Sequence, residues 1–267
     1  VGRTTMCPTE IFHDANEEPY VKLLPIETRF RDESIGHLKE MPIEWSKISL
    51  NIESATDMRQ AMMSLAEAKK IFALEARMMG LLDESNPDMV VNDNDKVEVP
   101  VWRYAMINYP HPLLTNGLSI LDTPGLNAMG LEPELTLNVI PNAHAVLFLL
   151  GIDTGVTRSD MQVWEKHVPP SVSQRIAVLN KIDLMWDDLK AHDEIAQAIQ
   201  RQTENTSMLL NIPGSRVLAV SAQKALVGKI RGDMPMIQMS GISRLESLLA
   251  DEIIPSRRKI ISDKVLH

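Results

Sequence analysis

Two short segments carry side chains whose types and spacing suit phosphate, metal and base binding. Residues 122–125 read Asp-Thr-Pro-Gly and follow an apolar run at 118–121. An apolar run that stops at Pro and Gly predicts a buried strand entering a loop. Asp122 would then lie at the carboxyl end of its strand, where open α/β sheets bind ligands. A carboxylate there can hold a hydrated Mg²⁺, and the amide of Gly125 can approach a terminal phosphate, although the same four residues also suit an ordinary strand-to-turn junction.

The second segment favours the binding interpretation. Residues 180–183 read Asn-Lys-Ile-Asp and follow a β-like run at 175–179. The carboxylate of Asp183 can accept two hydrogen bonds at once, which suits N1–H and the exocyclic amine of guanine, whereas adenine offers no such pair of donors. Asn180 can reach the other edge of the base, and the aliphatic stem of Lys181 can lie along its face. We therefore expect a guanine-binding motif here.

A third segment, residues 216–220, has the composition of a strand and runs into Ser221-Ala222. The backbone N–H groups of such a turn can contact guanine O6. Together the three segments resemble the guanine-nucleotide motifs of the P-loop GTPases, in their translation-factor-like branch. The phosphate-binding loop of those proteins, Gly-x-x-x-x-Gly-Lys-Ser/Thr, is absent from the sequence. The Gly228-Lys229 pair comes after the base motif and lacks the following Ser or Thr, so we interpret it as a surface loop.

Composition limits the classes of protein that the chain can represent. Its 267 residues are 44% hydrophobic, which is enough for one large or two small domains with a sizeable core. A net charge of −9 argues against a general nucleic-acid role. A single cysteine, Cys7, excludes an internal disulfide and fits a reducing, cytoplasmic compartment. The sequence shows neither a signal peptide nor an apolar run near the roughly 20 residues that span a bilayer.

The first nine residues, Val-Gly-Arg-Thr-Thr-Met-Cys-Pro-Thr, start without an initiator Met, and we interpret the chain as a fragment. A Gly followed by two Thr suits a loop, and a Thr hydroxyl can complete a Mg²⁺ shell. The pattern Gly-x-Thr-Thr-x-Cys-Pro-Thr resembles switch I of the dynamin superfamily, in particular the bacterial dynamin-like proteins. That family has its phosphate loop directly before this segment, which places the missing motif upstream of Val1. By position in the motif, Thr5 is the expected Mg²⁺ ligand, with Thr4 as the alternative.

The elements that must position these motifs also resemble a dynamin. Hydrophobic periodicity predicts one helix over residues 56–82, between a strand at 20–24 and strands at 97–101 and 103–107. This insert before Asp122 is longer than a small GTPase needs. After Gly125 we expect helices at 132–139, 159–167 and 187–210, a buried strand at 145–150, and a helix that starts at a Ser243–Glu246 capping box.

Taken together, the resemblance implies an α/β P-loop GTPase fold with a mostly parallel sheet, and it covers almost the whole chain. Residues 1–254 would form a dynamin-type GTPase domain that lacks its first strand, P-loop and first helix. Residues 255–267 would begin a helical bundle or stalk.

The activity implied by the resemblance is hydrolysis of GTP to GDP by in-line attack of water, in which positioning and electrostatics supply most of the rate. Thr5 would bind Mg²⁺ and hold the water through its carbonyl, and the Gly125 amide would sense the γ-phosphate. The residue after Gly125 is Leu126, where small GTPases have a water-orienting Gln. Dynamins share this departure and use instead the phosphate loop and a monovalent cation, K⁺ or Na⁺.

That machinery is completed when two GTPase domains face each other, so the resemblance implies a homodimer and nucleotide-dependent self-assembly. Membrane remodelling would require a peripheral membrane contact through regions outside this acidic chain. Without its phosphate loop, this chain alone is expected to be inactive.

Two other classes of protein stay open from sequence. One is a GTPase switch of another branch, acting on ribosomes or tRNA, which a basic RNA-binding domain elsewhere in the protein would favour. The other is a degenerate GTPase that only serves as a scaffold. The intact Asp122, Gly125 and Asp183 argue against the scaffold.

Overall fold

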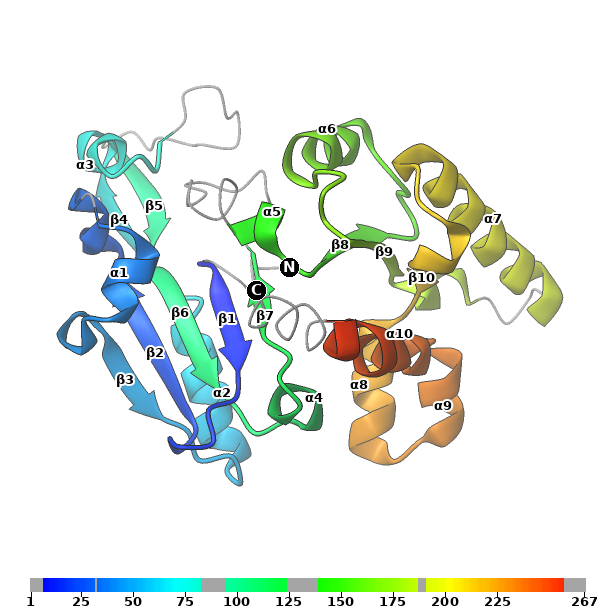
Figure 1. Ribbon diagram of the computed structural model, residues 1–267, viewed down its shortest axis with the longest axis horizontal. Coiled ribbons are helices and arrows are strands. Elements are labelled where there is room, and N and C mark those ends of the chain that lie inside the picture. The colour runs from blue at the N-terminus through cyan, green and yellow to red at the C-terminus, as the bar shows by residue number, and fades with distance from the viewer. Residues whose placement is uncertain (1–6, 32, 83–94, 124–138, 187–190, 257–267) are drawn as a thin grey trace, which may run out of the picture. The chain divides into compact units, whose positions relative to one another are not determined.

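The computed structural model describes residues 7–31, 33–82, 95–123, 139–186 and 191–256. The chain forms two compact units, Val1–Leu135 and Thr136–His267. Figure 1 shows the first in blue to green and the second in green to red. Both units combine strands with helices, which confirms the predicted α/β class.

The first unit contains two sheets and short helices. Its strands are β1 (Thr9–Phe12), β2 (Tyr20–Pro25), β3 (Ser46–Ser49), β4 (Ala68–Phe72), β5 (Lys96–Pro100), β6 (Trp102–Asn108) and β7 (Ile120–Asp122). Its α-helices are α1 (Ile35–Lys39), α2 (Ala55–Ser64), α3 (Ala73–Met78) and α4 (Pro112–Thr115), with 3-10 turns η1 (Ile26–Phe30) and η2 (Pro42–Glu44). Five strands form one sheet in the order β3-β2-β6-β1-β7, and β4 pairs with β5.

Both faces of the five-stranded sheet are covered by helices, because successive apolar side chains of β2 point to opposite faces. Val21 and Leu23 of β2 pack with Ala61 of α2 in one cluster. Leu24, the next residue along β2, packs with Leu38 of α1 in another. Successive side chains of a strand point to opposite faces, so α1 and α2 lie on opposite sides of the sheet (Figure 1). Of its strand pairs only β1–β6 is parallel, so the predicted parallel character does not extend to this sheet.

The prediction of a single helix over residues 56–82 is wrong. The segment forms α2, then β4, then α3. The interruption at β4 follows from long-range pairing, since Ala68 lies opposite Pro100 and Phe72 opposite Lys96 in an antiparallel ladder with β5. The strand supplies Ile71 to a small core with Val97 and Val99 of β5. Tertiary pairing therefore overrides the local helical periodicity.

The second unit is a parallel sheet with longer helices. Its strands are β8 (Ala145–Gly151), β9 (Gln174–Asn180) and β10 (Val217–Ala219), in the order β10-β9-β8, with all pairs parallel. Its α-helices are α5 (Ile140–Asn142), α6 (Arg158–His167), α7 (His192–Leu210), α8 (Ala222–Arg231), α9 (Met234–Met239) and α10 (Ile242–Leu248). Short 3-10 turns η4 (Ile182–Met185) and η5 (Gly214–Arg216) and a π-helical turn η6 (Leu249–Ile253) complete it.

The core of the second unit joins the sheet to α6 and α7. Leu150 of β8 and Leu179 of β9 pack with Trp164 of α6 and Leu210 of α7. The indole N–H of Trp164 donates to the carbonyl of Leu210 at 3.2 Å, which links the two helices. Thr157 begins α6 with a capping box to Asp160, in which both reciprocal hydrogen bonds form. The predicted strands at 145–150 and 175–179 and the helix at 159–167 are confirmed within a residue or two.

Two local interpretations in this unit are wrong. Gly228-Lys229 is not a surface loop but lies inside α8, and Gly228 is buried there. A Cβ on Gly228 would lie 2.9 Å from the side chain of Ile237, so the glycine permits close packing of α9. The capping box expected at Ser243 does not start a helix, because α10 begins at Ile242 after Gly241. The expected helices at 132–139 and after 257 lie outside the described residues.

Candidate functional site

The guanine motif lies where two parallel strands end together. Leu179 of β9 lies opposite Ala219 of β10, so Asn180 and the turn after β10 emerge at the same sheet edge. The N–H of Val220 donates to the carbonyl of Leu179 at 2.8 Å, and the N–H of Ile182 donates back to the carbonyl of Val220 at 3.2 Å. These bonds continue the ladder past the strand ends. They hold the 180–183 and 221–222 segments side by side.

Asn180 ties the two segments together through its side chain. Its Oδ1 accepts hydrogen bonds from the N–H of Lys181 at 2.8 Å and from the N–H of Ala222 at 3.0 Å. Lys181 has a left-handed backbone with φ of 66°, which turns the chain sharply into η4. Left-handed non-glycine residues are uncommon and concentrate at functional turns. The turn presents Asp183 at the same edge as Ser221.

Ser221 contributes through its hydroxyl, a role that the sequence analysis missed. The hydroxyl donates to Oδ1 of Asp183 at 2.6 Å and accepts from the N–H of Lys224 at 3.2 Å, so it also caps α8. Ser221 is completely buried. A hydrogen bond of this length to a carboxylate belongs to the strong class. It fixes the orientation of Asp183, whose remaining lone pairs can accept two donors from a base.

The two backbone N–H groups of the Ser221-Ala222 turn, which are expected to contact guanine O6, donate within the protein here. The N–H of Ser221 donates to the carbonyl of Ser240 at 2.8 Å. The N–H of Ala222 donates to Asn180. In this structure the turn therefore shapes the site mainly by holding Asn180 and Asp183.

Asp122 lies in the first unit at the end of β7. β1 pairs antiparallel with β7, and Thr9 lies opposite Asp122. Cys7 is buried just before β1. Burial raises the pKa of the Cys7 thiol to about 12, and the nearby Asp122 charge acts in the same direction. The pairing thus brings Cys7 and Thr9 close to Asp122. Thr4, Thr5 and Gly125 themselves lie outside the described residues.

Asp122 is a suitable group for holding Mg²⁺ through water. Asp122 is exposed at the end of β7. Mg²⁺ is typically bound by one or two carboxylates together with waters and substrate phosphates, not by a cage of protein ligands. Within the described part of the chain, no three His, Cys, Asp or Glu side chains gather as a metal cluster. A single exposed carboxylate fits the former arrangement.

In each unit one sheet has an edge strand with an exposed apolar side chain. β8 is the edge of its sheet, yet its sequence is apolar almost throughout, which is typical of a strand with neighbours on both sides. Leu149 of β8 is 64% exposed. β7 is the edge of the five-stranded sheet, and Ile120 is 41% exposed. The strand before Asp122 was predicted to be buried; that prediction is wrong, and β7 is an exposed edge.

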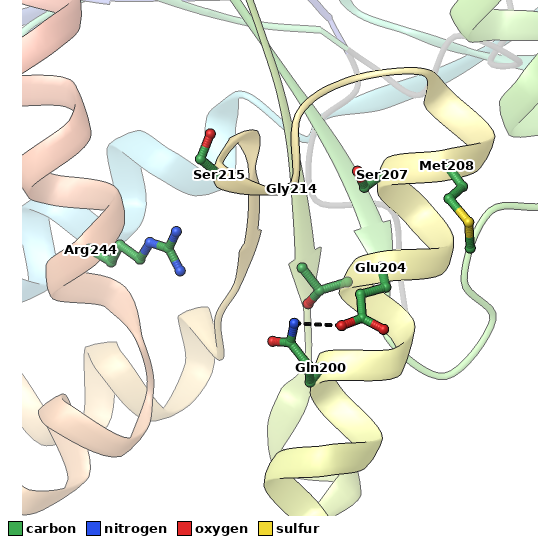
Figure 2. A pocket seen from close by; sticks show the side chains of 8 residues that line it. Gln200, Glu204, Ser207, Met208, Gly214, Ser215 and Arg244 are labelled. Carbon is green, nitrogen blue, oxygen red and sulfur yellow. Dashed lines mark hydrogen bonds between the residues drawn. The ribbon is translucent and has the colours of Figure 1, made fainter.

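The second unit also has an open hollow of about 510 Å³, lined by residues of α7, η5 and α10. Figure 2 shows Gln200 and Glu204 on α7, joined by a hydrogen bond of 2.9 Å, with Arg244 on the opposite side and the η5 turn between. The predicted nucleotide-binding residues do not line it. In the described parts of the chain, no helix is both long and apolar enough to cross a lipid bilayer.

Comparison with known sequences gives one family and several relatives. A sequence profile of the dynamin family matches residues 1–182. A bacterial dynamin-like protein from Nostoc punctiforme is 26% identical in an alignment of 161 residues that covers 56% of this chain and 23% of that protein. The Arabidopsis thaliana protein named "Probable transmembrane GTPase FZO-like, chloroplastic" is 32% identical over 128 residues, covering 45% of this chain and 13% of that protein. The chain therefore spans less than a quarter of the length of these two relatives.

Comparison with solved structures gives the same fold. One structure of an oligomerised bacterial dynamin pair, described as a mechanism for long-range sensing and tethering of membranes, matches with a TM-score of 0.52. It is 15% identical and covers 98% of this chain and 44% of that chain. A second structure of such a pair matches with a TM-score of 0.50 at 15% identity, covering 94% of this chain and 34% of that chain.

Proposed function

Because this chain belongs to the dynamin family, whose members are GTPases, we propose that the protein binds GTP with Mg²⁺, hydrolyses it to GDP and couples turnover to self-assembly. The observation that carries the proposal is the bonded pair of Ser221 and Asp183 at the common end of β9 and β10. A buried hydroxyl that orients an otherwise available carboxylate suits recognition of the two adjacent donors of guanine.

Each predicted site residue has a role in this proposal. Asp183 accepts from N1–H and the exocyclic amine of the base, and Lys181 lies along the face of the ring. Asn180 holds the Ala222 turn and so keeps the two loops at a fixed separation. On the phosphate side, Asp122 binds Mg²⁺ through water.

Thr5 binds Mg²⁺ directly and positions the attacking water, and the Gly125 amide contacts the γ-phosphate. Bound Mg²⁺ would neutralise the negative charge that develops on the phosphate oxygens. A monovalent cation, K⁺ or Na⁺, would complete the site.

The edge strands support the proposed domain organisation. The family resemblance puts a strand and the phosphate-binding loop upstream of Val1. A parallel strand added to β8 would satisfy its outer backbone groups and cover apolar side chains such as Leu149, which is exposed here. We take residues 1–254 as the GTPase domain and 255–267 as the start of a helical bundle. On this proposal the chain without the upstream loop is inactive.

Self-association and membrane contact are proposed at the level of the whole protein. The neighbouring structures are oligomerised bacterial dynamin pairs described as sensing and tethering membranes. We propose a homodimer through GTPase domains, in the cytoplasm, with peripheral membrane contact made by regions outside this chain. Nothing in the acidic composition indicates a nucleic-acid partner.

The proposal is tested on the full-length protein by calorimetric titration with GTP, GDP and ATP, with and without Mg²⁺, and by phosphate release. We expect binding of both guanine nucleotides, weak or absent ATP binding, and Mg²⁺-dependent release of phosphate from GTP. Equal affinity for ATP and GTP would contradict guanine recognition. Guanine binding without phosphate release in a dimerising protein would favour the scaffold instead.

A further inference from the structure

The turn that contains Ser221 is hydrogen-bonded to the junction between α9 and α10. The N–H of Ser221 donates to the carbonyl of Ser240 at 2.8 Å, and both residues are completely buried. Gly241, the next residue, has φ of 70° and precedes α10. The junction therefore contacts β10 and the Ser221 turn through backbone atoms.

Gly241 allows this contact because it has no side chain. A Cβ at this position would lie 2.4 Å from the carbonyl oxygen of Ala219 and 3.7 Å from Cα of Val220. The first distance is shorter than any real contact, and both partners are backbone atoms that belong to the end of β10 or to the turn itself. Any side chain at 241 must therefore push the junction and the end of β10 apart.

Two hydrogen bonds connect this junction to the carboxylate of Asp183. The junction holds the backbone of Ser221, the Ser221 hydroxyl donates to Asp183 Oδ1 at 2.6 Å, and Asp183 faces the base in the proposed function. The donor hydrogen bond is short and directional, so it weakens steeply when its partners move. Displacement of the turn would leave Asp183 without its orienting donor.

We propose that Gly241 is a positioning residue for guanine recognition, which acts through the backbone of Ser221 to set the orientation of Asp183. The inference rests on the proposed function and extends it to a residue in the α9–α10 junction, which none of the nucleotide motifs includes. It predicts that a side chain at 241 lowers the selectivity for guanine over other bases, in addition to any loss of nucleotide affinity.

The test compares Gly241→Ala with Gly232→Ala in the full-length protein. Gly232 is a matched control because it has φ of 68° at the end of α8 and a Cβ there would meet nothing within 4 Å. Alanine suffers the same left-handed strain at both positions. The two variants differ only in whether the added carbon meets the end of β10.

The readout is the ratio of affinities for GTP and inosine triphosphate, measured by competition with a fluorescent guanine nucleotide. Inosine lacks the exocyclic amine, so the ratio reports how well Asp183 is placed at that amine. We expect Gly241→Ala to lower the ratio by about tenfold, the size of a lost hydrogen bond to a charged group. Gly232→Ala should leave the ratio at the wild-type value, because a general loss of stability lowers the affinity for both nucleotides by the same factor.

Ser221→Ala supplies the second variant, since it removes the hydroxyl and leaves the backbone contact in place. It should lower the ratio by a similar factor, and Gly241→Ala added to it should lower the ratio no further, because both act on the same bond. If circular dichroism shows that Gly241→Ala does not fold, Ser221→Ala decides, and an unchanged ratio in that variant overturns the inference.

The remaining outcomes separate this inference from the proposed function. A wild-type protein that binds no guanine nucleotide overturns the proposed function and this inference together. A wild-type protein that prefers GTP, with Gly241→Ala indistinguishable from Gly232→Ala, overturns this inference alone.

Discussion

Thr9 lies directly opposite Asp122 in the antiparallel pair of β1 and β7. The pair joins the segment that resembles switch I to the Asp-x-x-Gly motif through a backbone ladder, although the two are far apart in sequence. A further hydrogen bond, from the Thr9 hydroxyl to the carbonyl of Cys7 at 3.1 Å, tightens the chain just before β1. Cys7 and Thr9, the described residues of this segment, are therefore held close to Asp122.

The resemblance of this segment to switch I motivates a prediction about Thr5. In the full-length protein, Thr5→Ala should lower GTP turnover by about a hundredfold or more, as removal of a transition-state ligand does. Nucleotide affinity should change little, because the side chain acts on Mg²⁺ and water and not on the base. Phosphate release and a fluorescent-nucleotide titration measure the two quantities. Loss of turnover in Thr4→Ala with normal turnover in Thr5→Ala would show that the register is wrong by one residue.

Base choice is predicted to depend on Asp183. Asp183→Asn replaces an acceptor with a donor, so GTP should bind more weakly by about 1.5–3 kcal/mol, while xanthosine triphosphate should gain affinity. Oδ1 of the new side chain can still accept from Ser221, so the fold should survive. Competition titrations measure both nucleotides. Asp193→Asn, an exposed change in the first turn of α7, is the control and should alter neither affinity.

Catalysis is predicted to need two copies of the domain. Leu126 cannot orient water, and in the proposed function the water is positioned by groups completed across a dimer. Specific activity should rise with protein concentration, and the complex with GDP and aluminium fluoride should run as a dimer in light-scattering chromatography. A specific activity that stays constant over a hundredfold concentration range, with a monomeric fluoroaluminate complex, would remove this mechanism and leave a nucleotide-binding domain.

A charge at the outer edge of β8 is predicted to help the 267-residue chain and to harm the full-length protein. In the 267-residue chain alone, Leu149→Lys should reduce aggregation, because a charge on an exposed edge strand opposes pairing with other chains. In the full-length protein the same change should prevent folding, because the added strand would bury the charge. Leu226→Lys, on α8 and 61% exposed, is the control and should be tolerated in both. Light scattering and thermal unfolding measure the outcomes, and equal tolerance of Leu149→Lys in both would exclude a covering strand.

The strands of the second unit could be predicted from sequence because their signal is local. β8 is a near-continuous apolar run, and β9 has four consecutive apolar residues at 176–179, as is typical of parallel strands. β4 could not be predicted, since its sequence Ala-Lys-Lys-Ile-Phe contains good helix formers and becomes a strand only by pairing with β5. The exposure of β7 was equally hidden, because its sequence does not say whether a neighbour covers it.

The same distinction holds within the candidate site. Asn180 and Asp183 were predicted because the spacing of a short motif reflects their chemistry. The roles of the Ser221 hydroxyl and of Gly241 depend on contacts between segments that meet only in the folded chain. A glycine after a short helix has many structural uses, so its sequence context carries no signal of a nucleotide site.

The raised pKa of Cys7 makes the chain convenient for site-specific labelling. With a pKa of about 12 and a buried side chain, its thiol is almost entirely un-ionised at neutral pH, and the thiolate is the form that reacts with maleimides. Because Cys7 is the only cysteine in the sequence, a new cysteine at an exposed position such as Leu226 would carry a fluorophore or spin label nearly alone. Probes of motion could thus be attached to either unit without first removing a native thiol.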